Sequence, residues 1–207
     1  MTQLSPAQHG IWLTERMLDT GGAYQLSLTV DLTGPLDTEA LDLACRTVAA
    51  HHPALSSRPG PDASVRPCEV PGPRHVDCAP GELDAALAEE RAAPFDTETG
   101  PLCRFTLFRA GPEHHVLLVS AHHLVLDGQS KDRLVADLAA AYRGDPLPPA
   151  PEIRPQTAGP EALVAARAYW EERGYTPGPP VLPGFVPPPD GGMVAAPGAE
   201  VPFRLDG

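Results

Sequence analysis

The sequence has few basic residues for its length and no long apolar run. Its 207 residues include 15 Lys and Arg against 27 Asp and Glu, which gives a formal net charge of −12 at pH 7. An acidic chain without a basic run argues against a nucleic acid or an anionic membrane as partner. No apolar run approaches the roughly 20 residues that a membrane-spanning helix needs, and the first residues lack the basic and apolar regions of a signal peptide. We therefore expect a soluble cytoplasmic protein with neither nucleic acid nor membrane as partner.

Cysteine pairs of the C-x-x-C kind are also absent. Four cysteines spread over a chain of this length do not make the disulfide framework of a small secreted protein. The length is enough for one domain with a buried core, or for one lobe of a larger domain. We expect free thiols in a reducing compartment at Cys45, Cys68, Cys78 and Cys103.

Three segments have the hydrophobic pattern of strands. Residues 24–32 alternate between apolar and polar side chains, which predicts a strand with one buried face. Residues 102–109 and 116–121 are more apolar, and Gly111-Pro112 between them favours a hairpin. The apolar run at 116–121 is unbroken, which favours a central strand that is buried on both faces.

Helical spacing and capping residues predict five helices around these strands. Ser5 is expected to cap the first helix, with Pro6 and Gln8 at the positions favoured after a cap, and Gly21-Gly22 to end it. The other four are expected between Asp37 and Pro53 and over residues 82–93, 130–143 and 161–173. Helices and strands without strict alternation predict an α/β layered sandwich, with a mixed β-sheet and flanking helices.

Proline and glycine are abundant, at 27 and 19 residues, and they are unevenly spread. Residues 58–81 are expected to form short strands and loops, and residues 146–160 a linker. Residues 176–202 are too rich in Pro and Gly to pack regularly, and residues 201–205 have the composition of a further strand.

The segment 120–130 has the strongest signal for chemistry, because it joins the most apolar strand to the clearest helix. Such loops often carry the functional groups of α/β proteins. An imidazole of His122 or His123 can act there as a general base, Asp127 can orient it or fix the loop, and Gly128 permits a tight turn. The alternative is that these are ordinary polar residues at a strand end.

Two other readings of the histidines are less favoured. Adjacent residues on an extended chain point to opposite faces, so His122 and His123 make a poor joint ligand set for a metal with Asp127. The other histidine pairs, at 51–52 and 114–115, lie at the ends of predicted elements and are expected to be solvated.

Four stretches together resemble one protein family. Residues 122–128 resemble the H-H-x-x-x-D-G signature of condensation domains of nonribosomal peptide synthetases, which belong to the chloramphenicol-acetyltransferase-like superfamily. Residues 5–12 resemble its opening motif, S-x-A-Q-x-R-L/M-W, and residues 94–104 its F-D-x-x-x-G-P-L-x-R stretch. Residues 168–170 resemble the helix that closes the first of its two lobes. The four matches follow the order of the family.

The resemblance implies a mechanism and its residues. Two carrier proteins present phosphopantetheine-tethered substrates, and the amine of the acceptor attacks the thioester of the donor. His123 is then the catalytic residue and His122 supports it. Asp127 braces the loop through an ion pair, and Gly128 offers an N–H to the thioester oxygen. The resemblance implies no metal and no cofactor bound by the chain itself, because the carriers supply the phosphopantetheine.

The family's second motif, R-H-E-x-L-R-T, is altered here. Its second arginine, which pairs with the signature aspartate, is replaced by Ser56, and Gly10 replaces the arginine of the opening motif. Arg58 lies two residues after Ser56 and would share its face on a strand. Our hypothesis is that Arg58 or another arginine supplies the missing ion pair.

Family members are much longer than this chain, and the motifs of their second lobe are absent. The resemblance therefore implies an N-terminal lobe over residues 1–175, followed by a crossover linker and the start of a truncated second lobe over residues 176–207. Its partners would be the carrier proteins and the missing C-terminal lobe or the rest of a synthetase. We expect the uncovered surface to cause self-association.

Two other functions stay open at this point. The chain can be a binding module that docks a carrier protein or a second lobe without turnover. It can also be a relative of epimerization domains, which share the signature and in which a histidine moves a Cα proton.

Overall fold

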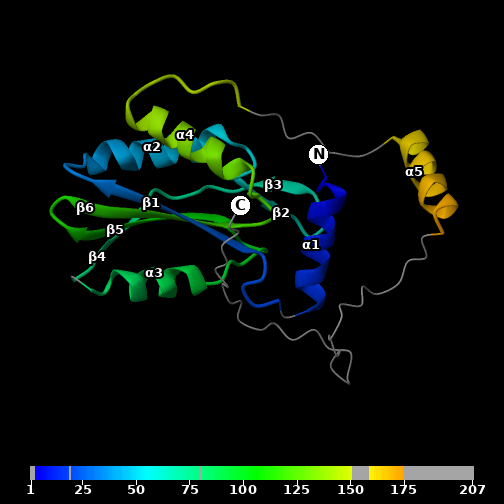
Figure 1. Cartoon of the computed structure of the whole chain (residues 1–207), viewed down its shortest axis with the longest axis horizontal. Coiled ribbons are helices and arrows are strands. Elements are labelled where there is room, and N and C mark those ends of the chain that lie inside the picture. The colour runs from blue at the N-terminus through cyan, green and yellow to red at the C-terminus, as the bar shows by residue number, and fades with distance from the viewer. Residues whose placement is uncertain (1–2, 19, 80, 151–158, 175–207) are drawn as a thin grey trace, which may run out of the picture.

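The computed structural model describes residues 3–18, 20–79, 81–150 and 159–174. It consists of a central sheet between helices, with a small second sheet beside it (Figure 1). The elements in chain order are α1 (Pro6–Met17), β1 (Gln25–Thr33), α2 (Thr38–His51), β2 (Ser57–Pro59), β3 (Val65–Pro67), β4 (Arg74–Asp77), α3 (Leu83–Ala92), β5 (Cys103–Gly111), β6 (His114–His122), α4 (Ser130–Tyr142) and α5 (Pro160–Glu172).

The main sheet is mixed, as the sequence predicts. Its strand order is β1-β6-β5-β4, and only β4 and β5 run parallel to each other. β5 and β6 form the predicted hairpin, and β6 lies between β5 and β1. The strands β2 and β3 pair separately, within the segment that was expected to hold short strands. The predicted class, an α/β layered sandwich, is confirmed.

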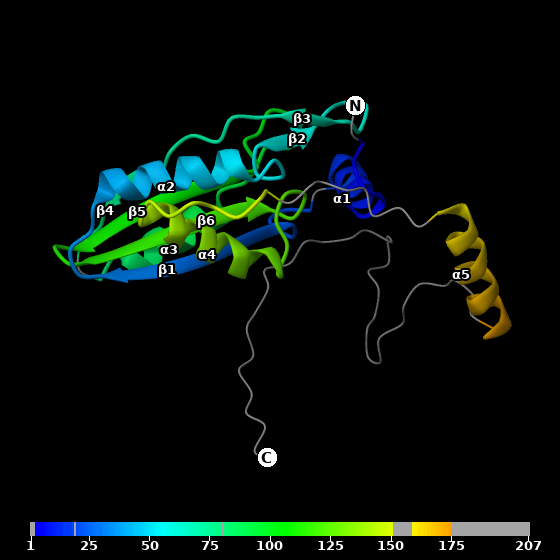
Figure 2. The same ribbon diagram turned by 90° about the horizontal axis from the view of Figure 1, so that it is seen from above.

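Helices cover both faces of the main sheet (Figures 1 and 2). Residues of β5 and β6 alternate between the two faces, and both sets are buried. The set on the α2 and α4 side joins the larger core cluster, which includes Leu41, Val48, Leu107, Leu117, Val119, Leu134 and Leu138. The opposite set joins a smaller cluster with α3, formed by Leu87, Phe108, Val116 and Leu118. The unbroken apolar run of β6 is thus explained by burial on both sides.

The start of α1 follows the prediction and its end does not. Ser5 Oγ accepts a hydrogen bond from Gln8 N, and Gln8 Oε1 accepts one from Ser5 N, so the capping box is complete. The helix ends at Met17, because Leu18 already has an extended backbone. The prediction that Gly21-Gly22 ends this helix is therefore wrong.

The helix α5 makes no core within the part of the chain that the structure describes. It buries none of its residues, and Leu163, Val164 and Trp170 are 60%, 69% and 53% exposed. The predicted strand at 201–205, the Pro/Gly-rich segment 176–202 and most of the predicted linker lie outside the described residues. No helix in the described ranges combines the length and the apolar character needed to cross a membrane.

Candidate active site

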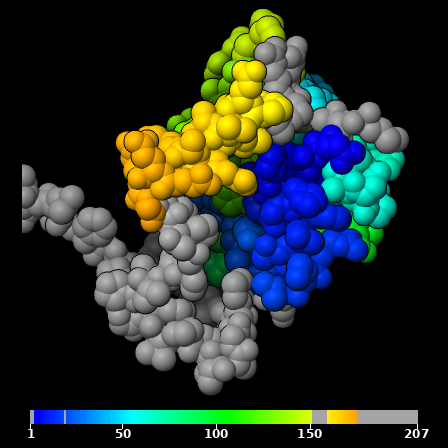
Figure 3. Space-filling view, turned by 90° about the vertical axis from the view of Figure 1, so that its right-hand side faces the viewer, coloured from blue at the N-terminus to red at the C-terminus, as the bar shows by residue number. Residues whose placement is uncertain are grey.

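The signature loop follows β6 at the end of the sheet where α1 lies (Figure 1). Three apolar residues anchor the loop: Leu124, Val125 and Leu126 are 3%, 8% and 7% exposed. α1 also holds the loop directly, because Gln8 Nε2 donates a hydrogen bond to Leu124 O at 2.7 Å. Viewed from this end, α1 (blue) lies beside the β2–β3 segment (cyan) in Figure 3. The polar residues of the signature are thus placed on a fixed loop.

His122 is the last residue of β6 and lies inside the protein, with 2% of its surface exposed. Its Nε2 is 3.0 Å from Glu15 Oε1, and its Nδ1 accepts a hydrogen bond from Leu124 N at 3.2 Å. The rings of Tyr24 and Phe95 lie 6.2 and 6.3 Å from its own, centroid to centroid. This imidazole is therefore enclosed and has a partner on each nitrogen.

His123 faces the opposite way and is exposed. Its backbone N–H donates to Tyr24 O at 2.8 Å, which fixes the chain at this point. Its side chain borders an open groove of about 650 Å³. The groove is lined by Ser5, Pro6, Ala7, Gln8, Ile11, Ala54, His123, Leu124, Val125, Leu126, Asp127 and Ser130. Of the two signature histidines, His123 is the one that a substrate in this groove can reach.

Asp127 holds the turn that leads into α4. Its Oδ1 accepts hydrogen bonds from the Oγ of Ser130 at 2.6 Å and from the backbone N of Ser130 at 2.8 Å. These two bonds, and chiefly the one from the Ser130 hydroxyl, lower the pKa of the Asp127 carboxyl. The carboxylate is thus a charged neighbour of His123 at the edge of the groove.

The predicted ion pair between Arg58 and Asp127 does not form. The Arg58 guanidinium donates to Glu98 O at 2.7 Å and to Pro59 O at 3.4 Å. Within residues 3–150, apart from 19 and 80, no arginine makes an ion pair with Asp127. The part of the hypothesis that names Arg58 is wrong, and among the described residues the hydroxyl and backbone N–H of Ser130 are the groups that hold the Asp127 carboxylate.

Gly128 is exposed, and its backbone does not need a glycine. Its φ is not positive, and an added Cβ would meet nothing within 4 Å. The expectation that this turn needs a glycine is therefore wrong. Among the described residues its N–H has no hydrogen-bond partner, which leaves it free to donate to a substrate.

The described part of the chain holds no group of three His, Cys, Asp or Glu side chains suited to a metal ion. His122 and His123 point to opposite sides of the loop, one inward to Glu15 and one to the groove. The arrangement offers a single accessible imidazole, a nearby carboxylate and a free backbone N–H.

Comparison with known proteins assigns the family. The family model of the condensation domain matches residues 74–189. Cyclosporin synthetase simA of Tolypocladium inflatum is 34% identical over 156 residues, which cover 70% of this chain and 1% of the synthetase. The chain belongs to the condensation domain family. The nonribosomal peptide synthetase resemblance deduced from the sequence motifs is thereby confirmed.

Two solved structures show that the fold is similar as well. The first condensation domain of the calcium-dependent antibiotic synthetase, in complex with a substrate analogue, has a TM-score of 0.61 and 26% identity, covering 82% of this chain and 44% of the solved one. The X-domain from teicoplanin biosynthesis, solved in complex with OxyB, has a TM-score of 0.62 and 32% identity, covering 83% and 38%. The chain thus spans less than half the length of these solved chains.

A second polar cluster of the condensation domain lies behind the loop and was missed by sequence reasoning. His52 is 8% exposed, and its Nε2 is 2.8 Å from Asp137 Oδ2, which also accepts from Arg133 Nε at 2.7 Å. Burial alone would raise the pKa of Asp137, but the hydrogen bonds from Arg133 and His52 outweigh it and lower that pKa. The expectation that His52 is solvated is therefore wrong.

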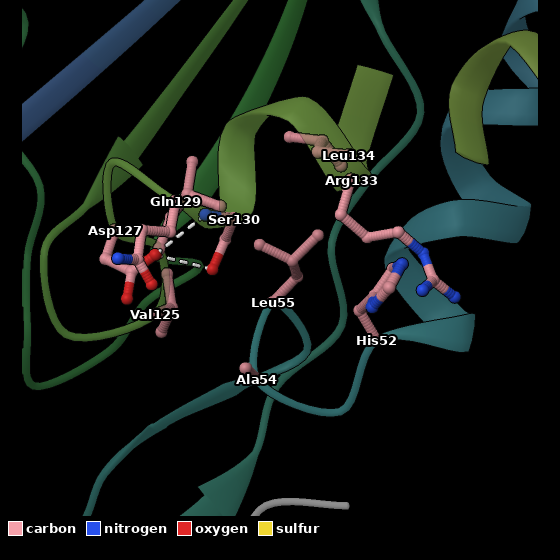
Figure 4. A pocket seen from close by; sticks show the side chains of 10 residues that line it. His52, Ala54, Leu55, Val125, Asp127, Gln129, Ser130, Arg133 and Leu134 are labelled. Carbon is pink, nitrogen blue, oxygen red and sulfur yellow. Dashed lines mark hydrogen bonds between the residues drawn. The ribbon is translucent and has the colours of Figure 1, made fainter. Parts of the chain in front are cut away.

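This cluster joins α2 to α4 beside the signature loop. Figure 4 shows His52 and Arg133 on one side of a hollow, Asp127 and Ser130 on the other, and Leu55 between them. The hollow has a volume of about 350 Å³ and adjoins the groove of His123, with which it shares Asp127 and Ser130. The only sequence signal was the polar Asp137 at a position where the helical period places core residues.

The expectation that His115 is solvated is also wrong. It is 7% exposed, and its Nδ1 is buried without a hydrogen-bond partner among the described residues. It lies on β6, where every residue after His114 is buried. His115 is thus buried together with the rest of β6, although its place beside His114 at the start of the strand suggested that it is solvated.

Proposed function

We propose that this chain is the histidine-bearing N-terminal lobe of an amide-forming condensation domain of a nonribosomal peptide synthetase. Membership in the family supports the reaction class. The observation that carries the proposal is the placement of His123, whose exposed imidazole borders the groove of about 650 Å³ beside α1. It is the accessible imidazole of the signature, because His122 is enclosed.

In the proposed reaction the acceptor amine attacks the carbonyl carbon of the donor thioester. A C–N bond forms and the C–S bond breaks, while one proton leaves the amine and ends on the sulfur of the donor's phosphopantetheine, which departs as a thiol. His123 takes that proton or holds the amine by a hydrogen bond. The free N–H of Gly128 donates to the oxygen that becomes negative in the transition state. Asp127 fixes the turn that contains Gly128 through its hydrogen bonds from Ser130.

The substrates arrive on two carrier proteins, so the chain itself needs no bound cofactor. We propose that residues 1–175 form this lobe and that residues 176–207 lead to a second lobe supplied by the rest of the protein or by a partner. Coverage of only 44% of a solved condensation domain supports a need for that second part. A groove completed by it would exclude water from the thioester, which protects the intermediate.

A second candidate function is a binding module without turnover. One structural neighbour, the teicoplanin X-domain at 32% identity, was solved in complex with OxyB, so this fold also serves as a docking partner. The replacement of the motif arginine by Ser56 is compatible with this alternative, since the ion pair expected of that arginine is absent here. The catalytic proposal is preferred because His123 remains in place and accessible.

The test is amide formation by the 207-residue chain. The chain is mixed with an acyl-pantetheine thioester and an amine, with and without a separately produced second lobe, and amide is measured by mass spectrometry. We expect amide from the wild type with the second lobe and none from His123→Ala. His114→Ala is the matched control, because this exposed histidine lies at the other end of β6.

The outcomes separate the two candidates. Equal amide formation by wild type and His123→Ala would reject His123 as the catalytic residue. No amide in any mixture, together with retained binding of a carrier protein or of the second lobe, would reject catalysis and favour the binding module.

A further inference from the structure

Glu15 places a carboxylate inside the protein, directly behind the signature histidines. It lies on α1, and its side chain is only 15% exposed. Oε1 is 3.0 Å from His122 Nε2 and 3.3 Å from the hydroxyl of Thr20, which donates to it. Oε2 is buried and has no hydrogen-bond partner among the described residues. A buried polar atom without a partner costs stability, so this carboxylate requires an explanation beyond packing.

The contacts of His122 determine which of its nitrogens carries the proton. Nδ1 lies 3.2 Å from Leu124 N, whose N–H can only donate, so Nδ1 must present a lone pair. The proton then sits on Nε2 and is donated to Glu15 Oε1. In the other tautomer two donors would face each other at Nδ1, while Nε2 would present a lone pair to a carboxylate. Glu15 and the N–H of Leu124 therefore favour the same tautomer, and Glu15 contributes by accepting the proton of Nε2.

Leu124 N–H belongs to the peptide unit that directly follows His123. The N–H on the other side of His123 is held by Tyr24 O at 2.8 Å. Gln8 holds the next carbonyl, that of Leu124, at 2.7 Å. The backbone of His123 is thus fixed on both sides, and the bond on its C-terminal side depends on the tautomer of His122.

We propose that Glu15 is a positioning residue for His123, acting through the tautomer of His122 and the N–H of Leu124. The effect on catalysis rests on the function proposed above. Glu15 does not line the groove, so its loss changes the orientation of His123 and leaves the substrate contacts in place. The rings of Tyr24 and Phe95 enclose His122, which limits the access of water as a substitute acceptor for the Nε2 proton.

The first measurement is the protonation of the His122 ring nitrogens by long-range ¹H–¹⁵N spectroscopy on the 207-residue chain. In the wild type we expect a proton on Nε2 and none on Nδ1. Glu15→Met keeps a side chain of similar length without an acceptor oxygen, and it should shift His122 toward the Nδ1–H tautomer. Glu15→Gln keeps an oxygen that can accept from Nε2, and it should retain the wild-type tautomer. Glu98→Gln is the control. Glu98 carries an exposed carboxylate that pairs with Arg16, and Arg16 lies on the same helix as Glu15.

The second measurement is amide formation with the second lobe added. Loss of the residue that orients a metal-binding histidine typically costs about 10–100-fold in activity, and by analogy we expect a loss of this size in kcat for Glu15→Met. KM should stay unchanged, because Glu15 does not contact the groove. Glu15→Gln and Glu98→Gln should both stay near the wild-type kcat.

Two results would overturn the proposal. One is a wild-type His122 with its proton on Nδ1, which needs no variant and so does not depend on whether Glu15→Met folds. The other is a folded Glu15→Met variant with wild-type tautomer and wild-type kcat. A wild type that forms no amide would contradict the proposed function alone, and a tautomer shift in Glu15→Met would then still support control of His122 by Glu15.

Discussion

Two of the three His-His pairs in the chain, those at 51–52 and at 122–123, can be compared directly, and each has one histidine inside and one near the surface. In both, the inner imidazole meets a carboxylate: His52 meets Asp137 at 2.8 Å, and His122 meets Glu15 at 3.0 Å. The difference lies in how well the carboxylate is satisfied.

Asp137 accepts hydrogen bonds from both His52 and Arg133, so its buried charge is compensated on two sides. The Oε2 atom of Glu15 has no partner within the described ranges. The His52 cluster therefore fits a structural joint between α2 and α4. The Glu15 pair keeps an uncompensated group beside the groove, which is expected at a functional site and not at a joint.

Removal of the Asp137 carboxylate should have the largest effect on stability. Asp137→Ala leaves His52 and Arg133 without their shared acceptor, and breaking a buried pair costs about 3–5 kcal/mol in the free energy of unfolding. Urea unfolding measures this cost. Asp145→Ala is the control, because its exposed pair with Arg143 should contribute about 0–1 kcal/mol. Equal losses of unfolding free energy in both variants would show that the His52 cluster does not hold α2 and α4 together.

Acid should remove the stabilisation that the Asp137 carboxylate contributes. The pKa of Asp137 is lower in the folded protein than in the unfolded chain, where it is about 3.9. The carboxylate therefore stabilises the fold fully above the unfolded pKa, and this stabilisation is lost as pH falls through the folded pKa. The difference in unfolding free energy between wild type and Asp137→Asn should shrink from about pH 4 downward. A difference that grows in acid would contradict the assigned direction.

Asp127→Ala should have a moderate effect. It removes the two bonds from Ser130, the first residue of α4, and loss of a side chain that holds the start of a helix in a comparable way costs about 0.5–2 kcal/mol. Because these bonds fix the turn next to His123, amide formation should fall further than stability does. Thermal unfolding and the amide assay measure the two effects, and Asp127→Asn should recover most of the stability. Full activity in Asp127→Ala would show that the turn needs no brace.

Gly128→Ala should have the smallest effect on stability. The φ of Gly128 is not positive and an added methyl group would contact nothing within 4 Å, so the change should stay within about 0.5 kcal/mol. Activity should be retained if only the N–H of Gly128 acts on the substrate. A stability loss near that of Asp127→Ala would mean that the loop is more tightly packed than the structure indicates.

Local sequence patterns predicted the parts of the fold that depend on neighbours in the chain. The alternation in β1, the apolar run of β6 and the capping box at Ser5 are each contained within a few residues, and the structure confirms them. The exposed His123 at the end of a buried strand also follows from adjacency, since consecutive side chains point to opposite sides.

The partners of the buried histidines depend on distant segments, and sequence reasoning failed there. His122 and Glu15 are 107 positions apart, and His52 and Asp137 are 85 apart. Arg58 shows the same limit, because its distance from Asp127 depends on the placement of β2 and its contact with Glu98 O. Only the packing of α1, α2 and α4 around the loop decides these pairs.

The position of β6 has a consequence for how the protein opens. This strand is hydrogen-bonded on both edges, and its two faces belong to two separate core clusters. It cannot detach without disrupting both helical layers, so its backbone amides should exchange with deuterium only when the whole sheet and its helices unfold. His122 is the last residue of this strand, and the signature loop is therefore attached to the part of the protein expected to open least often.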